Sequence, residues 1–194
     1  MRKLSAALIV GLIFLLSSCK KEKVSGNEYP GYYYMATIGG VDYKVEIPKD
    51  NADINLKVGS ALGGLDDVVI TGYITNLHSD RSELTISKGL MHNYQAATDA
   101  EFKNFFAPGS YNYAPYGSNG ISIAWRDVNW DVWTSEWAAD QLGSSFKIIS
   151  SEVEPGNSGV LQLKIVAQFN CNLSDGNGNV KAATGTFVGL FGMH

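Results

Sequence analysis

"LQLKIVAQFNCNLSDGNGNVKAATGTFVGLF", residues 161–191, predicts two long antiparallel strands joined by a tight turn. From Leu161 to Leu173 apolar residues alternate with polar ones, which is the period-2 pattern of a strand with one buried and one solvated face. The segment 174–179 contains Asp-Gly and Asn-Gly steps, and these supply the positive φ angles that hairpin turns need. "TGTFVGLF", residues 184–191, then returns as the partner strand.

A second hairpin is expected near the front of the chain. "YYYMATI" (32–38) and "VDYKVEI" (41–47) flank Gly39-Gly40. Further strand-like runs occur at residues 67–74, 83–87, 120–125 and 145–149. Many short strands with glycine-rich turns, in a chain with 21 glycines, favour an all-β fold over a βαβ fold. The expected architecture is an antiparallel β-sandwich with jelly-roll or Ig-like layering.

One short helix is expected within "ATDAEFKNFFAPG", residues 97–109. Thr98 and Glu101 have the spacing of a capping box, and Pro108 stops the helix. Phe102, Phe105 and Phe106 fall on one helical face. We expect these phenylalanines to plug an open end of the sandwich rather than to line a binding site.

The N-terminal segment "MRKLSAALIVGLIFLLSSCKKEK" has the features of a secretory signal. Its apolar run, Ala6 to Leu16, is well short of the roughly 20 residues that a membrane-spanning helix needs. Leu16-Ser17-Ser18-Cys19 resembles the lipobox of bacterial lipoproteins. That resemblance implies cleavage before Cys19 and acylation of this cysteine, so the mature protein is expected to be anchored in the membrane by lipid.

The chain is therefore expected to divide into a signal peptide (1–18), the lipidated Cys19 with a flexible spacer (19–31), and a single β-sandwich domain (32–194). Loss of the signal removes two basic residues and no acids, so the formal net charge moves from −4 to −6. An acidic domain without a basic tract is a poor partner for nucleic acid. With Cys19 acylated, Cys171 has no partner for a disulfide.

This arrangement resembles a group of uncharacterised envelope lipoproteins common in Bacteroidota. The shared segments are "ATIGGVDYK" (36–44), "APGSYNY" (107–113), "SSFKI" (144–148) and residues 168–191. The resemblance implies a β-sandwich and an envelope location, and it transfers no catalytic residue. Lys20 after the cysteine is compatible with release to the outer membrane, and Lys20-Lys21-Glu22 resembles part of a surface-export signal. Display at the cell surface and at the periplasmic face both remain open.

All four tryptophans lie in "AWRDVNWDVWTSEW", residues 124–137. Trp125 continues the alternation of Ile121 and Ile123 and is expected in the core. A turn and a returning strand would bring the other tryptophans near water, beside Tyr116. Such rings, edged by Asp and Asn, suit stacking against sugars, so the candidate ligand-binding residues are Tyr116, Trp130, Trp133 and Trp137. Two alternatives stay open: these rings fill the core, or residues 130–137 form a helix that buries three of them.

Signatures of enzymes are absent from the sequence. There is no nucleophile elbow or phosphate loop, and His78, His92 and His194 lack a recognised metal spacing. We therefore predict no catalytic residue, no cofactor and no metal site. The expected function is that of a non-catalytic, lipid-anchored binding protein of the outer envelope, with glycan as the ligand. A structural or protein-interaction lipoprotein is the alternative, and a hydrolase that uses two carboxylates is a third hypothesis.

Overall fold

The computed structural model describes residues 31–47, 50, 52–60, 66–77, 81–154 and 160–193. The predicted signal peptide (1–18), Cys19 and all of the predicted spacer except Gly31 lie outside these residues. Within the described ranges, no helix is long and apolar enough to cross a membrane.

The described part of the chain contains eleven strands, one α-helix and one short 3₁₀ helix. In chain order they are β1 (Tyr32–Ile38), β2 (Val41–Ile47), β3 (Ala52–Ser60), β4 (Val68–Asn76), β5 (Glu83–Met91), η2 (Tyr94–Ala96), α1 (Asp99–Phe105), β6 (Gly109–Tyr111), β7 (Gly120–Arg126), β8 (Val132–Thr134), β9 (Ser145–Glu154), β10 (Gln162–Ser174) and β11 (Val180–Gly192).

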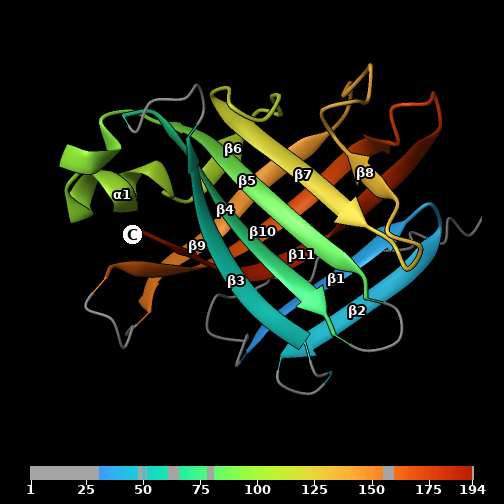
Figure 1. The fold of residues 1–194 in the computed structure, drawn as a ribbon, viewed down its shortest axis with the longest axis horizontal. Coiled ribbons are helices and arrows are strands. Elements are labelled where there is room, and N and C mark those ends of the chain that lie inside the picture. Colours follow the sequence, from blue (N-terminus) through green and yellow to red (C-terminus); the bar gives the residue numbers. More distant parts are fainter. Residues whose placement is uncertain are drawn as a thin grey trace, which may run out of the picture.

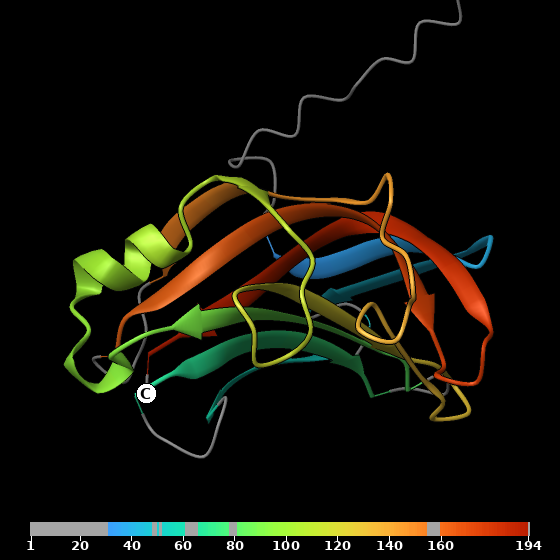
Figure 2. The same ribbon diagram turned by 90° about the horizontal axis from the view of Figure 1, so that it is seen from above.

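The strands form one continuous antiparallel sheet. Its order is β2-β1-β11-β10-β8-β7-β5-β4-β3, and β9 pairs with both β10 and β6. In Figure 1, β3, β4, β5 and β7 lie in front and cross β1, β11, β10 and β9 behind them. Figure 2 shows the same two halves as layers that face each other. The sheet thus curls until its two outermost strands, β2 and β3, approach each other, and the result is a nearly closed, barrel-like fold.

Both predicted hairpins are confirmed. β10 and β11 pair along their full length, from Gln162 opposite Gly192 to Ser174 opposite Val180. β1 and β2 pair in the same way around Gly39 and Gly40, whose φ angles of 59° and 82° lie in the region that favours glycine. The all-β, antiparallel class and the single short α-helix are therefore as the sequence predicts.

A β-sandwich has two sheets that are not hydrogen-bonded to each other, whereas this fold has one continuous sheet. The pairing of β10 accounts for this difference. Residues from Gln162 to Asn170 pair with β9, whereas Ser174 at the far end pairs with Thr134 of β8. One long strand therefore belongs to both facing halves. The strands of the predicted sandwich are joined by hydrogen bonds into a single curled sheet.

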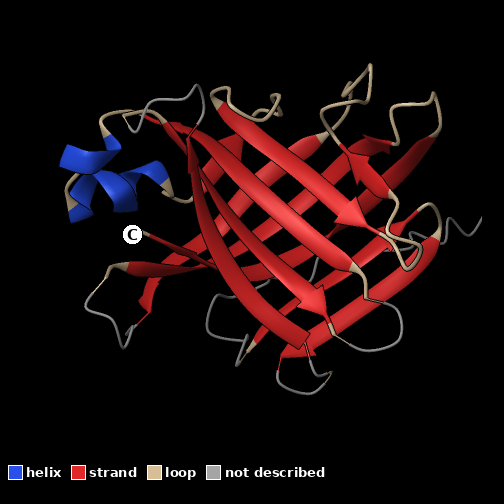
Figure 3. Cartoon of the chain, viewed as in Figure 1, coloured by secondary structure: helices blue, strands red, loops and turns tan. Residues whose placement is uncertain are grey.

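The short helix α1 covers one end of the sheet, as Figure 3 shows in blue. Its capping box is present: the Thr98 hydroxyl accepts a hydrogen bond from Glu101 N (3.3 Å), and the Glu101 carboxylate accepts one from Thr98 N (2.7 Å). Phe102 and Phe106 are fully buried, and the Phe106 ring lies 4.9 Å from that of Phe191. The predicted phenylalanine plug is therefore confirmed.

Candidate binding surface at the hairpin end

The end of the barrel opposite α1 is built from turns and carries two of the four predicted ligand-binding residues, Trp130 and Trp137. We call it the hairpin end, and it comprises residues 39–40, 127–131, 135–144 and 175–179. Cross-strand register places these segments together, because β1, β7 and β10 all run toward them. Figures 1 and 2 agree, since both place α1 at one end and these turns at the other.

Trp130 lies in the β7–β8 turn, and the carboxylate of Asp127 organises this turn. Asp127 Oδ1 accepts hydrogen bonds from Asn129 N (2.9 Å) and Asp131 N (3.0 Å). The backbone N–H of Trp130 donates to Asp127 O (3.0 Å), and Trp130 adopts a left-handed φ of 70°. The helical alternative for residues 130–137 is wrong, because this turn leads into β8. The Trp130 ring is 54% exposed.

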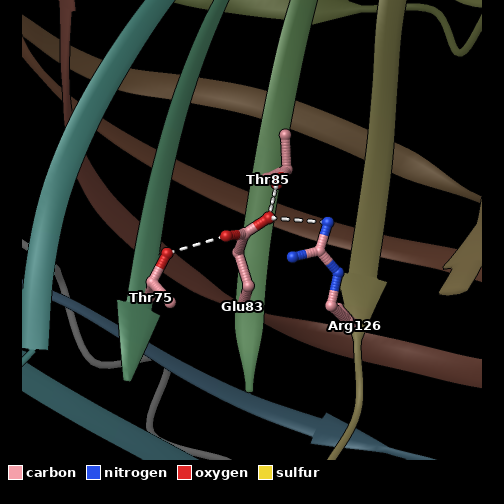
Figure 4. A network of polar contacts seen from close by, with 4 residues as sticks. All are labelled: Thr75, Glu83, Thr85 and Arg126. Atoms are coloured by element: carbon pink, nitrogen blue, oxygen red, sulfur yellow. Dashed lines mark hydrogen bonds and ion pairs between the residues drawn. The ribbon is translucent and has the colours of Figure 1, made fainter. Parts of the chain in front are cut away.

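A polar network on β4, β5 and β7 holds the side chain beside Trp130. The Arg126 guanidinium lies 5.1 Å from the Trp130 ring and 3.7 Å from the Glu83 carboxylate. Thr75 and Thr85 both donate hydrogen bonds to the same carboxylate, at 2.7 and 3.3 Å. Figure 4 shows Thr75, Thr85 and Arg126 converging on the Glu83 carboxylate. The network pre-orients Arg126 next to an exposed aromatic ring.

Trp137 occupies the other side of the hairpin end. Its ring packs over Gly176 in the β10–β11 turn and is 52% exposed. The loop that carries it is fixed by Gln141, whose amide donates to Asn172 O (2.7 Å) and accepts from Asn172 N (3.1 Å). At Asn172, between the residues of β10 that pair with β9 and with β8, the Gln141 side chain thereby makes the backbone hydrogen bonds that a neighbouring strand would otherwise make. Trp137 is thus held by a structured loop.

Trp133 faces the interior instead of the solvent. It is paired with Trp125, which is fully buried in the core as predicted. The Lys181 ammonium lies 3.6 Å from the Trp133 ring and 5.1 Å from that of Trp125. The indole N–H of Trp133 donates to Asp127 (3.4 Å). Trp133 therefore supports the Trp130 turn from below, and Val132 takes the outward position on β8.

Tyr116 does not lie in the turns of the hairpin end, although it lies close enough to the Glu136 carboxylate of segment 135–144 to interact with its charge. It is 44% exposed, and its hydroxyl lies against Gly59 of β3. Asp53 of β3 shares a cross-strand row with Arg126. Gly59 lies six residues further along β3, so Tyr116 contacts the sheet about 20 Å along the strands from the row of Arg126. Partial burial, with a smaller contribution from the Glu136 carboxylate, raises the pKa of Tyr116.

Exposed apolar side chains and carboxylates alternate around the hairpin end. The exposed apolar residues here are Val41, Val128, Trp130, Val132, Trp137, Leu142 and Val180. Aspartates outnumber basic residues in and beside these turns: they are Asp42, Asp127, Asp131, Asp140 and Asp175, against Arg126 and Lys181. Aromatic faces can stack on sugar rings while carboxylates accept hydrogen bonds from hydroxyl groups, so this mixture is suited to a neutral, hydroxyl-rich ligand.

Sequence reasoning missed the pairing of Arg126 with Glu83. The two residues are far apart in the chain and meet only through the β5–β7 register. The available signal was the alternation of Glu83, Thr85 and Ser87 on β5, which marks an outward polar face. Among the residues that the structure describes, no group of three or more His, Cys, Asp or Glu side chains is arranged to hold a metal ion.

Comparisons with protein-family models, with curated proteins and with solved structures found no match to this chain. Fold and surface together define only a class: an all-β protein with a nearly closed antiparallel sheet, one short helix, and an aromatic, acid-bordered surface at the end opposite that helix.

Proposed function

We propose that this protein is a lipid-anchored, non-catalytic binding protein of the outer envelope, and that it binds a neutral polysaccharide at the hairpin end. The observation that carries this proposal is the pair of half-exposed rings, Trp130 and Trp137, on ordered turns bordered by carboxylates. Rings of this size offer flat apolar area at little cost in side-chain entropy.

The surrounding charge favours a neutral ligand over an acidic one. The aspartates in and beside the turns of the hairpin end exceed Arg126 and Lys181 in number, and like charges in close contact oppose binding. Arg126 is also engaged by Glu83, which leaves less positive charge for an anionic polymer.

The state of the carboxylates supports binding without hydrolysis. Asp127 is occupied by the backbone of its own turn, and Asp175 accepts hydrogen bonds from Asn177 N (2.8 Å) and the Asn179 amide (2.7 Å). The bonds from Asn179 and Asn177 lower the pKa of Asp175. A general acid in glycoside hydrolysis needs a raised pKa, so Asp175 is suited to accepting hydrogen bonds rather than to acid catalysis.

The direction of β1 supports a role facing away from the membrane. β1 runs from Tyr32 toward the turn at residues 39–40, so the chain enters the domain at the end opposite the hairpin end. An anchor at Cys19 with a spacer up to residue 31 would then present the hairpin end outward, at either face of the outer membrane.

We also propose that the two facing halves of the curled sheet correspond to the two layers of the predicted β-sandwich.

Affinity electrophoresis tests the proposal with the soluble Cys19→Ser chain that lacks the predicted signal peptide. Gels containing laminarin, hydroxyethylcellulose or starch provide neutral polysaccharides, and polygalacturonate provides an acidic one. We expect at least one neutral polymer to retard the protein, and Trp130→Ala or Trp137→Ala to weaken binding about tenfold or more, as for truncated anchor residues. Tyr116→Ala is the matched control and should bind normally. Free migration in all neutral gels contradicts the proposal.

Docking of another envelope protein is the second candidate function. Val41, Val128, Val132 and Val180 add exposed apolar area to the same end, and such patches mark protein-interaction sites. Crosslinking in intact cells distinguishes the two functions. A stoichiometric protein partner that is lost with Val132→Asp, in a protein that binds no polysaccharide, would favour docking.

A further inference from the structure

Two adjoining grooves lie on the outer surface of the half-sheet formed by β1, β2, β9, β10 and β11. One has a volume of about 430 Å³ and is lined by Met35, Thr37 and Lys44; the other has about 470 Å³ and is lined by Lys147, Gln168 and Asn170. Both grooves are also lined by Thr184, Gly185 and Thr186 of β11. Because both are lined by the same segment of β11, the two grooves lie side by side, and we call them together the trough.

The trough runs across the strands rather than along them. Two outward-facing rows cross β2, β1, β11, β10 and β9 in register. The first row is Lys44, Met35, Thr186, Gln168 and Lys147, and the second is Asp42, Thr37, Thr184, Asn170 and Ser145. Neighbouring strands are about 4.8 Å apart, so each row is about 19 Å long. Side chains in a row therefore repeat at roughly the length of one sugar ring.

Gly185 permits the close approach of β11 and β1 at the middle of the trough. A Cβ atom at this position would lie 2.9 Å from Ala36 Cα and still closer to the Met35 carbonyl oxygen. Any side chain here would push the two strands apart. The glycine therefore belongs to the architecture that holds the two grooves together.

The lining of the trough is chemically suited to a neutral ligand. Hydroxyl and amide side chains make up four of the five positions in the second row, whereas the first row has Thr186 and Gln168 beside the exposed apolar Met35 and two lysines. The Lys44 ammonium is paired with Glu46 (3.2 Å), and the Asp42 carboxylate accepts a hydrogen bond from Thr37 (2.6 Å). Lys147 adds an exposed positive charge, while the charge of Lys44 is offset by Glu46. The other polar side chains of the trough present mainly donors and acceptors for hydroxyl groups.

The trough lies on the same strands as the turn that supports Trp137. Beyond Asn170 and Thr184, the next outward pair toward the hairpin end is Asn172 and Ala182. The β10–β11 turn with Gly176 follows, and Trp137 packs there. Six residues separate Asn170 from Gly176, which is about 20 Å along an extended strand. A polymer of several sugars that runs along β10 and β11 from Trp137 reaches the trough at Asn170 and Thr184 and turns there to lie across the strands, whereas a di- or trisaccharide does not reach that far.

We infer that the trough binds the continuation of the polysaccharide chain that Trp137 engages. The ligand is then a long, unbranched, neutral polysaccharide held along its length, and not a chain end or a short oligosaccharide. This inference rests on the function proposed above, and it adds the ligand's length and path.

Isothermal titration of the soluble Cys19→Ser chain tests the inference. The probes are laminarin, hydroxyethylcellulose and starch, with the trisaccharide and hexasaccharide of the laminari-, cello- and malto- series. For the series that binds, the hexasaccharide should bind at least about tenfold more tightly than the trisaccharide, because it reaches additional contacts. Asn170→Arg and Thr184→Arg, which obstruct the trough, should remove this gain and leave trisaccharide affinity unchanged.

Asn55→Arg on the outward face of β3 is the matched control, since it adds the same charge to the opposite half of the sheet. It should retain the gain, and denaturation curves of all three variants establish that they fold. Equal affinity for both lengths, or a gain that survives both trough variants, overturns the inference while the proposed function stands. A wild-type chain that binds none of the probes overturns both.

Discussion

The two ends of the barrel use the same chemical components in different ways. At the helix end, the Lys88 ammonium lies 4.2 Å from the Phe105 ring and 4.1 Å from the Tyr111 ring. At the hairpin end, the Lys181 ammonium lies between Trp133 and Trp125. Lys88 is only 4% exposed, whereas Lys181 is half-buried. One lysine is enclosed beneath α1, and the other borders an open surface.

This difference in burial predicts different effects of mutation at the two ends. The helix end buries its aromatic rings and makes the fold stable, while the hairpin end leaves Trp130 and Trp137 half-exposed. Within the described ranges, no carboxylate lies within ion-pair distance of Lys88, so its burial is costly. Stability and binding are therefore expected to respond to mutations at opposite ends.

Phe106→Ala should produce the largest effect on stability. The side chain is 1% exposed and packs against Phe102, Phe105 and Phe191. Removing a buried phenylalanine ring costs about 3–5 kcal/mol through lost burial and the cavity that remains. Urea denaturation measures this change in the free energy of unfolding. Trp130→Ala is the comparison from the hairpin end and should shift it by about 0.5 kcal/mol, as expected for an exposed site. Equal losses would contradict the division between the two ends.

Lys88 should make stability depend on pH. Burial lowers the pKa of Lys88 from its ordinary 10.5 to about 8. Between these values the unfolded chain binds a proton that the folded protein has released, so stability rises with pH. The rise should reach about 2–3 kcal/mol, since each pKa unit corresponds to about 1.4 kcal/mol. Burial raises the pKa of Tyr32 and Tyr113, and ionisation of these groups in the unfolded chain lowers stability above pH 10.

Urea denaturation at pH values from 7 to 10 measures the effect of Lys88. Lys88→Met keeps the apolar stem and removes the charge, so it should be more stable than the wild type at pH 7 and lose most of the rise. A wild-type curve that is flat over this range, or a Lys88→Met curve that rises equally, would show that Lys88 is not the titrating group.

Much of the fold could be predicted because its signals are local. The hairpins at 32–47 and 161–191 combine a period-2 pattern with glycine turns, and both occur as expected. β3 is not among the strands predicted from the sequence, although its residues alternate: Ile54 and Val58 face the core, whereas Asp53 and Lys57 face the solvent. Polar residues and a glycine weaken its strand propensity, and its pairing with β4 stabilises it. The single curled sheet depends on β10 pairing with two different strands, which no local pattern reveals.

The candidate site could be predicted only in part, because exposure depends on register. Trp125 was assigned to the core from its alternation with Ile121 and Ile123, and it is buried. Trp133 also faces inward, since it pairs with Trp125 across β7 and β8. Tyr116 is near Trp130 in sequence but lies against β3, because its loop folds over the outward face of that half-sheet. The trough brings together residues from six strands, so sequence spacing could not reveal it.

Lys181→Met provides the smallest and most discriminating test of the comparison between the ends. Cation–π contacts at partly exposed sites contribute about 0.5–1 kcal/mol, and methionine keeps the stem that packs beside Gly39. We therefore expect Lys181→Met to lower the free energy of unfolding by less than about 1 kcal/mol. The matched Lys88→Met change should raise it at pH 7, so the same substitution has opposite signs at the two ends. Burial then decides whether a lysine between aromatic rings stabilises the fold. Changes of equal sign and size, measured by urea denaturation at pH 7, would show that the aromatic contacts outweigh burial at both ends.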